Sequence, residues 1–208
     1  MIMLEIFALL NYTVMLIDIH NNKSAYEYAK EADIKIIAHK IHILEYARIT
    51  NSMIVALNLN KYDEFFKYKK KAFSFLNTGD YGNKPFDMFS YYNTLAEAYQ
   101  KLCHNRYTYR ILKRLLKLKA YRSDTNLAVI YFWLEAIRII LNKKTDIHNL
   151  IKYFESYEKI LDKNSKNDYA KIISKIVLDV SIALTMYCPD IDFSPLLFKL
   201  LKYKDVKI

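Results

Sequence analysis

The sequence predicts an all-α protein built from stacked antiparallel helical hairpins, that is, a helical solenoid. Chain breakers are scarce, because the 208 residues hold two Gly and three Pro while 53% of them are hydrophobic. A β-rich fold needs many turns, so this scarcity favours long helices joined by short links. Three turn-plus-helix units also recur 41–45 residues apart, beginning at Asn60, Asn105 and Asp146. Each follows a more apolar helix, a pattern typical of helical repeats.

The periodicity of apolar residues predicts a series of helices along the whole chain. In order they are 2–19, 24–49 with a break near Asp33, 51–59, 62–76, 86–104, 106–121, 125–142, 147–162, 167–187 and 195–204. Ser24 is expected to cap the second helix, and Ser194 with Pro195 to open the last one. Asp63 and Glu64 stand in a first turn, where the helix dipole favours acids. The most apolar run, 127–141, should be the most buried helix.

The one obvious loop covers residues 77–85 and holds both glycines, Gly79 and Gly82. Glycines confined to a single loop exclude a glycine-rich phosphate-binding loop. Trp133 lies in the apolar run and is expected in the core.

A strongly basic amphipathic helix is expected within 101–122, a segment with eight Lys or Arg residues and no acid. At 100° per residue, one face carries only cations and the opposite face carries aliphatic side chains. The cationic face consists of Arg106, Arg110, Lys113, Arg114 and Lys117. This face is the candidate contact for phosphates or an acidic partner, and it would position a nucleic acid by charge without reading its sequence.

The net charge of +10 is open to two interpretations. It fits a nucleic-acid-binding protein. It also fits an AT-rich genome, because Lys, Asn, Ile, Tyr and Phe share AT-rich codons and all are abundant here. Residues 1–33 carry −3, which leaves +13 for residues 34–208, and an acidic end on a basic body also suits self-association or a partner surface.

The first helix is expected to be a buried helix, not a signal peptide or membrane span, because it carries Glu5, Asn11 and Asp18. It is apolar nearly all round, and a terminal helix has one neighbour within a stack. We therefore expect a homodimer through its outer face. Two distant cysteines, Cys103 and Cys188, form no disulfide framework and indicate a cytoplasmic protein.

Catalytic and metal sites are not indicated. His39, His42 and Glu45 share one face of the expected helix, but one helix supplies too few ligands for a metal. The adjacent Cys103 and His104 point about 100° apart, which suits a nucleophile–base pair poorly. The 19 tyrosines suit stacking on single-stranded bases, yet most fall at apolar helical spacing and favour packing.

Several short motifs resemble the tetratricopeptide repeat. Tyr62-Asp63-Glu64 followed by Ala72 looks like its second helix, whereas Leu95-Ala96-x-x-Tyr99 and Leu127-Ala128-x-x-Tyr131 resemble its first helix. Long, Tyr- and Lys-rich repeats of this kind resemble the C-terminal regions of peptide-sensing regulators of Gram-positive bacteria and their phages (the Rap, Rgg and PlcR group). The resemblance covers about 40–165, and no helix-turn-helix domain is visible. It implies a right-handed solenoid whose first helices line a concave surface.

The resemblance assigns seven residues to that concave surface. They are Asn51, Asn93, Glu97, Gln100, Tyr131, Glu135 and Arg138. Amide side chains suit the backbone of an extended peptide because each donates and accepts, and the isolated acids Glu97 and Glu135 would select a cationic ligand residue.

We therefore expect one domain over 1–208, with N-terminal helices in 1–50, repeat hairpins in 51–165 and capping helices in 166–208. The expected function is a non-enzymatic module without metal or cofactor that holds a peptide or protein segment, in bacterial or phage regulation or defence. The alternative is a nucleic-acid-binding accessory protein that uses the 101–122 helix.

Overall fold

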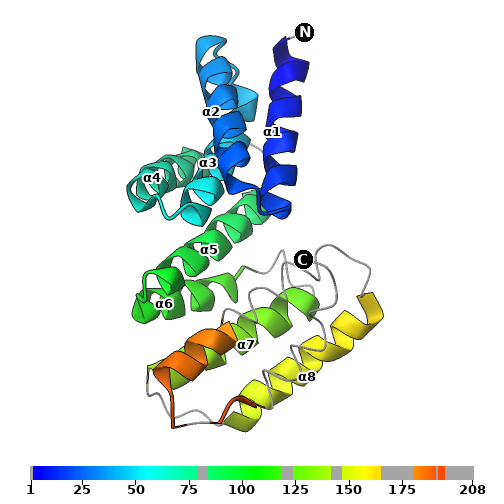
Figure 1. Cartoon of the computed structure of the whole chain (residues 1–208), viewed down its shortest axis with the longest axis vertical. Helices are drawn as coiled ribbons and strands as arrows, with labels where there is room; N and C mark the ends of the chain where they lie inside the picture. Colours follow the sequence, from blue (N-terminus) through cyan, green and yellow to red (C-terminus); the bar gives the residue numbers. More distant parts are fainter. Residues whose placement is uncertain are drawn as a thin grey trace. The chain divides into compact units, whose positions relative to one another are not determined.

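The protein is all-α. The computed structural model describes residues 2–78, 84–118, 124–141, 147–164, 180–190 and 192–194, and in these ranges helices and turns occur without a strand (Figure 1). The expected helix 195–204 and most of 167–187 and of the 77–85 loop lie outside the described residues. No described helix is long and apolar enough to cross a membrane.

The chain divides into two compact units, Met1–Tyr91 and Tyr92–Ile208, with the boundary inside one helix. This boundary coincides with neither of the divisions expected near 50 and 165. We describe each unit by itself.

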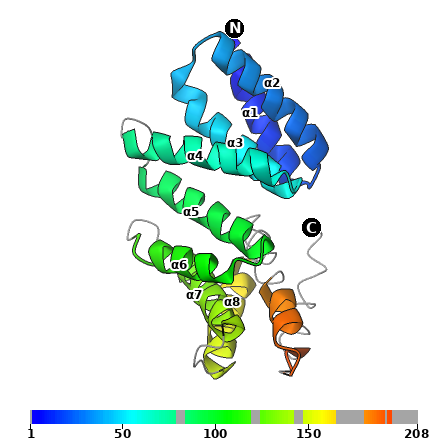
Figure 2. The ribbon, with the colours of Figure 1, turned by 90° about the vertical axis from the view of Figure 1, so that its left-hand side faces the viewer.

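The first unit is a succession of antiparallel helices. Its elements are α1 (Ile2–Asp18), α2 (Asn22–Ala38), the short 3₁₀ helix η1 (His42–Leu44), α3 (Glu45–Asn58), α4 (Tyr62–Thr78) and the first part of α5 (Lys84–Lys101). α1 packs against α2, α2 against α3 and α3 against α4, and α3 and α4 join through a short turn (Figure 2). α1 also contacts α3, so the expectation that the terminal helix has a single neighbour is wrong.

The core of the first unit depends on small side chains of α2. Ala25, Ala29 and Ala32 are fully or almost fully buried and recur at helical spacing along one side. Small residues allow close approach, so Ile6 and Leu10 of α1 pack directly over Ala32. The first helix was expected to be buried, but only the side of α1 that carries Ile6 and Leu10 is buried.

The second unit contains the rest of α5, α6 (Asn105–Leu115), α7 (Asp124–Ile140), α8 (Ile147–Asn164) and helical residues 180–187. α7 packs against both α6 and α8. The core of the second unit includes Phe132 and Phe154, whose ring centres lie 6.1 Å apart, and the buried Trp133. The expected core position of Trp133 is confirmed.

Four helices end in the same backbone turn. The residue after the C-cap adopts a left-handed conformation with φ between 53° and 60°, at His20, Lys40, Asn60 and Cys103. Its N–H donates to the carbonyl three residues earlier, and the next N–H donates to the carbonyl five residues earlier, at 2.8–3.3 Å. This pair of bonds is the Schellman motif, which satisfies carbonyl groups that a helix end leaves free.

The spacing of these turns sets the length of the helices in the first unit. The first three left-handed residues are 20 residues apart. A hairpin of two such segments is about 40 residues long, which agrees with the spacing of the turn-plus-helix units in the sequence. None of the four turns uses glycine, the residue that adopts this conformation at least cost, and the chain reverses direction without it.

Three expected boundaries are wrong. Asn21, not Ser24, caps α2, because its Oδ1 accepts a hydrogen bond from the Ser24 N–H at 3.4 Å. The chain breaks after Ala38 instead of near Asp33, and α3 then runs without interruption through residue 51. The helix expected over 106–121 ends at Leu115, so Lys117 lies in the following turn.

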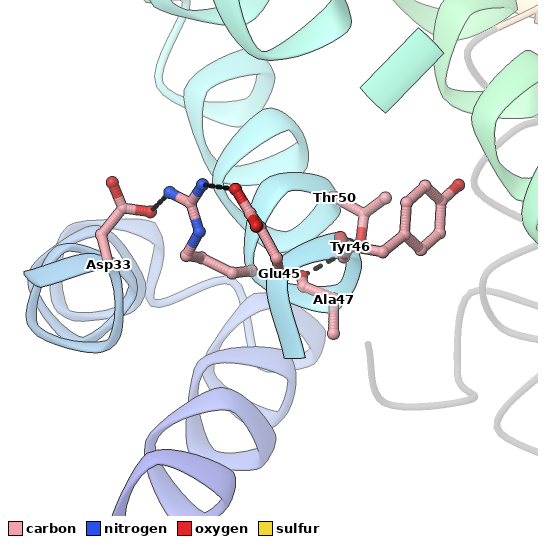
Figure 3. A network of polar contacts seen from close by, with 6 residues as sticks. Asp33, Glu45, Tyr46, Ala47 and Thr50 are labelled. Carbon is pink, nitrogen blue, oxygen red and sulfur yellow. Dashed lines mark hydrogen bonds and ion pairs between the residues drawn. The ribbon is translucent and has the colours of Figure 1, made fainter. Parts of the chain in front are cut away.

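Asp33 lies inside α2 and takes part in a largely buried ion pair between α2 and α3. The Arg48 guanidinium is almost wholly buried and binds the Asp33 carboxylate through Nη1. Its Nη2 lies 3.5 Å from Oε1 of Glu45, one turn earlier in α3. Figure 3 shows Asp33 and Glu45 on either side of the guanidinium group. Buried charges need such partners, so this network sets how α3 lies on α2.

Replacing Lys40 by glycine should stabilise the protein. A lysine pays a steric cost for its positive φ, so Lys40→Gly should raise the free energy of unfolding by about 0.5–1 kcal/mol. Asn60→Gly should have a smaller effect, because Asn tolerates this conformation. The measurement is urea unfolding followed by far-UV circular dichroism.

The matched control is Glu27→Gly, at an exposed site inside α2, where glycine should cost about 1 kcal/mol. Equal destabilisation by both glycines would contradict the role assigned to Lys40.

Candidate functional site

Glu135 and Arg138 of α7 form an ion pair in the second unit. They lie one turn apart, and Arg138 Nη1 is 2.7 Å from Glu135 Oε1. Glu135 is only 5% exposed, whereas the Arg138 side chain is 39% exposed. The pair therefore extends from the interior of the unit towards its surface.

This ion pair is incompletely satisfied. Glu135 Oε2 and Arg138 Nε are both buried, and neither has a hydrogen-bond partner among the described residues. A buried carboxylate oxygen without a donor is costly, since it has lost water and gained nothing in exchange. The hydrogen bond to Glu135 raises the pKa of Arg138 above its usual value, so the cation is firmly held. A ligand donor would satisfy Oε2, but because this oxygen is buried, the side chains that cover it have to move first.

Tyrosines from three helices surround Arg138. Tyr131 of α7 and Tyr153 of α8 stack with ring centres 5.1 Å apart and planes 13° apart. Tyr109 of α6 and Tyr153 lie close enough to Arg138 to add to the rise in its pKa. Stacked, half-buried tyrosines offer apolar faces and hydroxyl groups together, a combination common in binding sites.

The α5 residues predicted for the same site are partly paired with one another. Asn93 Nδ2 donates to Glu97 Oε1 at 3.0 Å, so two predicted residues meet. Gln100 lies one turn further and holds a buried Oε1 without a hydrogen-bond partner. Gln100 and Glu135 thus present the two unsatisfied buried side-chain acceptors in the described part of the second unit.

Asn51 lies apart from these residues, in the first unit. It is buried, and its Nδ2 donates to the backbone carbonyl of Leu10 at 3.2 Å, which ties α3 to α1. This hydrogen bond gives Asn51 a structural role. Its assignment to a peptide surface stays a prediction.

The basic face of α6 is exposed. None of its five cations forms an ion pair with another described residue, and the four in the helix all reach solvent. Lys117 is also exposed, in the turn after the helix, while Lys119 and Arg122 lie outside the described residues. Unpaired cations without neighbouring acids attract anions.

Aromatic rings accompany these cations. Tyr107 is 53% exposed and stacks on Tyr99 of α5, with ring centres 5.3 Å apart. His104 lies 6.1 Å from both rings. The Arg110 guanidinium lies 5.8 Å from the Tyr107 ring centre, within the range of a cation–π contact. The face therefore combines positive charge with an exposed stacking platform.

The expected shared helix face of His39, His42 and Glu45 is wrong, because the break after α2 separates His39 from the other two. His42 Nδ1 lies 3.4 Å from Glu45 Oε2. Among the described residues, no three His, Cys, Asp or Glu side chains gather as metal ligands would. Cys103 occupies a left-handed turn, and its hydrogen bond with the Tyr187 hydroxyl raises the pKa of that tyrosine.

Sequence reasoning missed Tyr109 and Tyr153 as neighbours of Arg138. Both belong to amphipathic helices, where the spacing indicated packing. Their position beside Arg138 depends on how α6 and α8 lie against α7.

Comparison with known proteins adds no family assignment. No family model matches the chain, and neither a curated protein nor a solved structure matches it. The tetratricopeptide resemblance therefore stays a prediction, and function is argued from the geometry above.

The Glu135–Arg138 pair should be energetically coupled. Arg138→Met leaves the buried carboxylate without its cation and should cost about 2 kcal/mol of stability. In a double-mutant cycle with Glu135→Gln, the coupling free energy should be about 1–2 kcal/mol by urea unfolding.

The Lys35–Glu5 pair is the control, because its N–O distance is also 2.7 Å while its carboxylate is far more exposed, 49% for Glu5 against 7% for Glu135. Its coupling should stay below about 0.5 kcal/mol. Equal coupling in the two pairs would mean that the burial of Glu135 carries no energetic weight.

Proposed function

We propose that this protein is a non-enzymatic, tetratricopeptide-like helical-repeat module that binds a peptide or protein segment. The recurring Schellman turns support the repeat, since they generate hairpins of about 40 residues. That length exceeds the usual 34 or so of the tetratricopeptide family, and the helices of 17–18 residues are correspondingly long.

The half-satisfied carboxylate of Glu135 carries the proposal for the binding site. A Lys or Arg side chain of the ligand donates to Oε2 once the side chains that bury this oxygen move aside, and the ligand backbone contacts Asn93 and Gln100. Tyr131 and Tyr153 supply the apolar surface around the charge. A charged hydrogen bond in so buried a position contributes more than one at the surface.

Neutralising Glu135 should remove the preference for cationic peptides. The probes are two fluorescein-labelled sets of random decapeptides, one with a central Lys and one with a central Glu. Wild type should bind the Lys set more tightly, and Glu135→Gln should weaken that binding about tenfold, which corresponds to about 1.4 kcal/mol. Fluorescence anisotropy measures both affinities. Glutamine has the shape of glutamate without its charge, so the variant should keep the fold. Circular dichroism checks this.

Glu27→Gln is the matched control, because Glu27 is an exposed helical glutamate in the first unit. It should leave binding unchanged. A folded Glu135→Gln variant that binds both peptide sets as wild type does would refute the site.

A second candidate function is binding of single-stranded nucleic acid by the basic face of α6. The specific observation in its favour is the stack of Tyr99 and Tyr107 beneath Arg110. Bases stack on exposed aromatic rings, and unpaired cations neutralise phosphates.

Under this second function, affinity for a single-stranded oligonucleotide should fall steeply with salt. Changing Arg106, Arg110 and Arg114 together to Gln should reduce the log–log salt slope by about two units. Tyr107→Ala should weaken binding by about 1–3 kcal/mol and leave the slope unchanged.

The charge-matched control changes Lys23, Lys67 and Lys70, all exposed in the first unit, to Gln. The log–log salt slope of this control variant should equal that of wild type. Absence of any binding at about 50 mM salt would eliminate this second function.

A further inference from the structure

We propose that a second copy of this chain covers the outer face of α1, so that the protein forms a symmetric dimer through antiparallel α1 helices. This inference is independent of the peptide and nucleic-acid proposals, since it concerns the first unit alone.

The outer face of α1 is apolar and exposed. The inner face packs on α2 and α3, and the side chains opposite to it remain open to solvent. They are Met3, Leu4, Phe7, Ala8, Val14 and Met15. Leu4 is 77% exposed and Phe7 is 55% exposed. Adjacent apolar side chains on one face mark an interaction surface, whereas scattered ones do not.

The central part of the face, residues 7–15, has the arrangement that self-pairing requires. Its residues follow a heptad spacing, and Asn11 stands at the centre. When two copies cross antiparallel at Asn11, Phe7 meets the second copy's Met15, and Ala8 meets its Val14. The two Asn11 amides then face each other and can exchange hydrogen bonds. A twofold interface needs such a self-complementary pattern.

Charge favours the antiparallel direction over the parallel one. A parallel pair in register would bring two Asp18 carboxylates together at one end. In the antiparallel pair they lie about 21 Å apart along the axis, at a rise of 1.5 Å per residue. The opposed helix dipoles add a small favourable contribution.

The area is sufficient for a weak, specific dimer. The exposed side chains present on the order of 600 Å² per copy, which places the pair near the lower limit of about 1,200 Å² for stable interfaces. Interfaces of this size are typical of weak association, and we expect a dissociation constant in the micromolar range. A membrane surface suits the face poorly, since residues 1–22 contain no Lys or Arg, which membrane-surface helices carry.

Sedimentation velocity of the full chain, from about 1 to about 100 µM, tests the proposal. Wild type should pass from monomer to dimer over this range, and Phe7→Lys with Met15→Lys should stay monomeric with an unchanged melting curve. Asn11→Leu should tighten the dimer about tenfold, because a polar residue at a core position costs stability.

The matched control places lysines at Ile34 and Ile43, each 68% exposed in the first unit but outside α1. It should dimerise as wild type does. A monomeric wild type at about 100 µM would overturn the proposal. A dimer that survives Phe7→Lys with Met15→Lys, or one that the control abolishes equally, would also overturn it.

Cross-linking tests the direction, with Cys103 and Cys188 changed to Ser. Asn11→Cys should form a disulfide-linked dimer on mild oxidation, and Leu4→Cys should not. Cross-linking through Leu4→Cys alone would exclude the antiparallel arrangement.

Discussion

The reversal of the chain at left-handed residues is the constraint on which the rest of the structure depends. His20, Lys40 and Asn60 each end a helix and turn the backbone so that the next helix packs antiparallel on the last. Because these turns come 20 residues apart, helices of 17, 17 and 14 residues stack in succession with their apolar sides in contact. The core contacts of α2 with α1, and the ion pair of Asp33 with Arg48, both follow from this alignment.

Arg48 and Glu135 are both buried charged residues, but their ion-pair partners differ. Arg48 in the first unit has Asp33 and Glu45 as carboxylate partners and links two neighbouring helices, although its buried Nε has no hydrogen-bond partner among the described residues. Glu135 in the second unit has Arg138 for one oxygen and no partner for the other. The charge of Arg48 is balanced by two carboxylates from the protein itself, which fits a structural role. The second oxygen of Glu135 is a buried acceptor without a donor, and the proposal of ligand binding at Glu135 rests on that oxygen.

The candidate site was predictable in part. Glu135 and Arg138 are three residues apart in a helix, so their meeting follows from helical geometry, as does that of Asn93 with Glu97. The burial of Glu135 was not predictable, because an isolated glutamate in an amphipathic helix is usually solvated. Asn51 shows the same difficulty: its spacing suited a ligand surface, but the carbonyl of Leu10, 41 residues earlier in the chain, takes its amide.

Local properties of the sequence determine that this protein is helical. The scarcity of Gly and Pro and the spacing of apolar residues predicted all-α structure, and the core position of Trp133, because both properties act within a few turns. The exact ends of the helices were harder to predict. Asn21 caps α2 by accepting from the backbone N–H of Ser24, and α2 continues through Asp33, whose carboxylate binds Arg48. Packing of distant segments alone determines that Tyr109 and Tyr153 stand beside Arg138 and that one face of α1 remains open. Contacts between helices depend on how each is rotated against its neighbours, and no local pattern in the chain specifies that rotation.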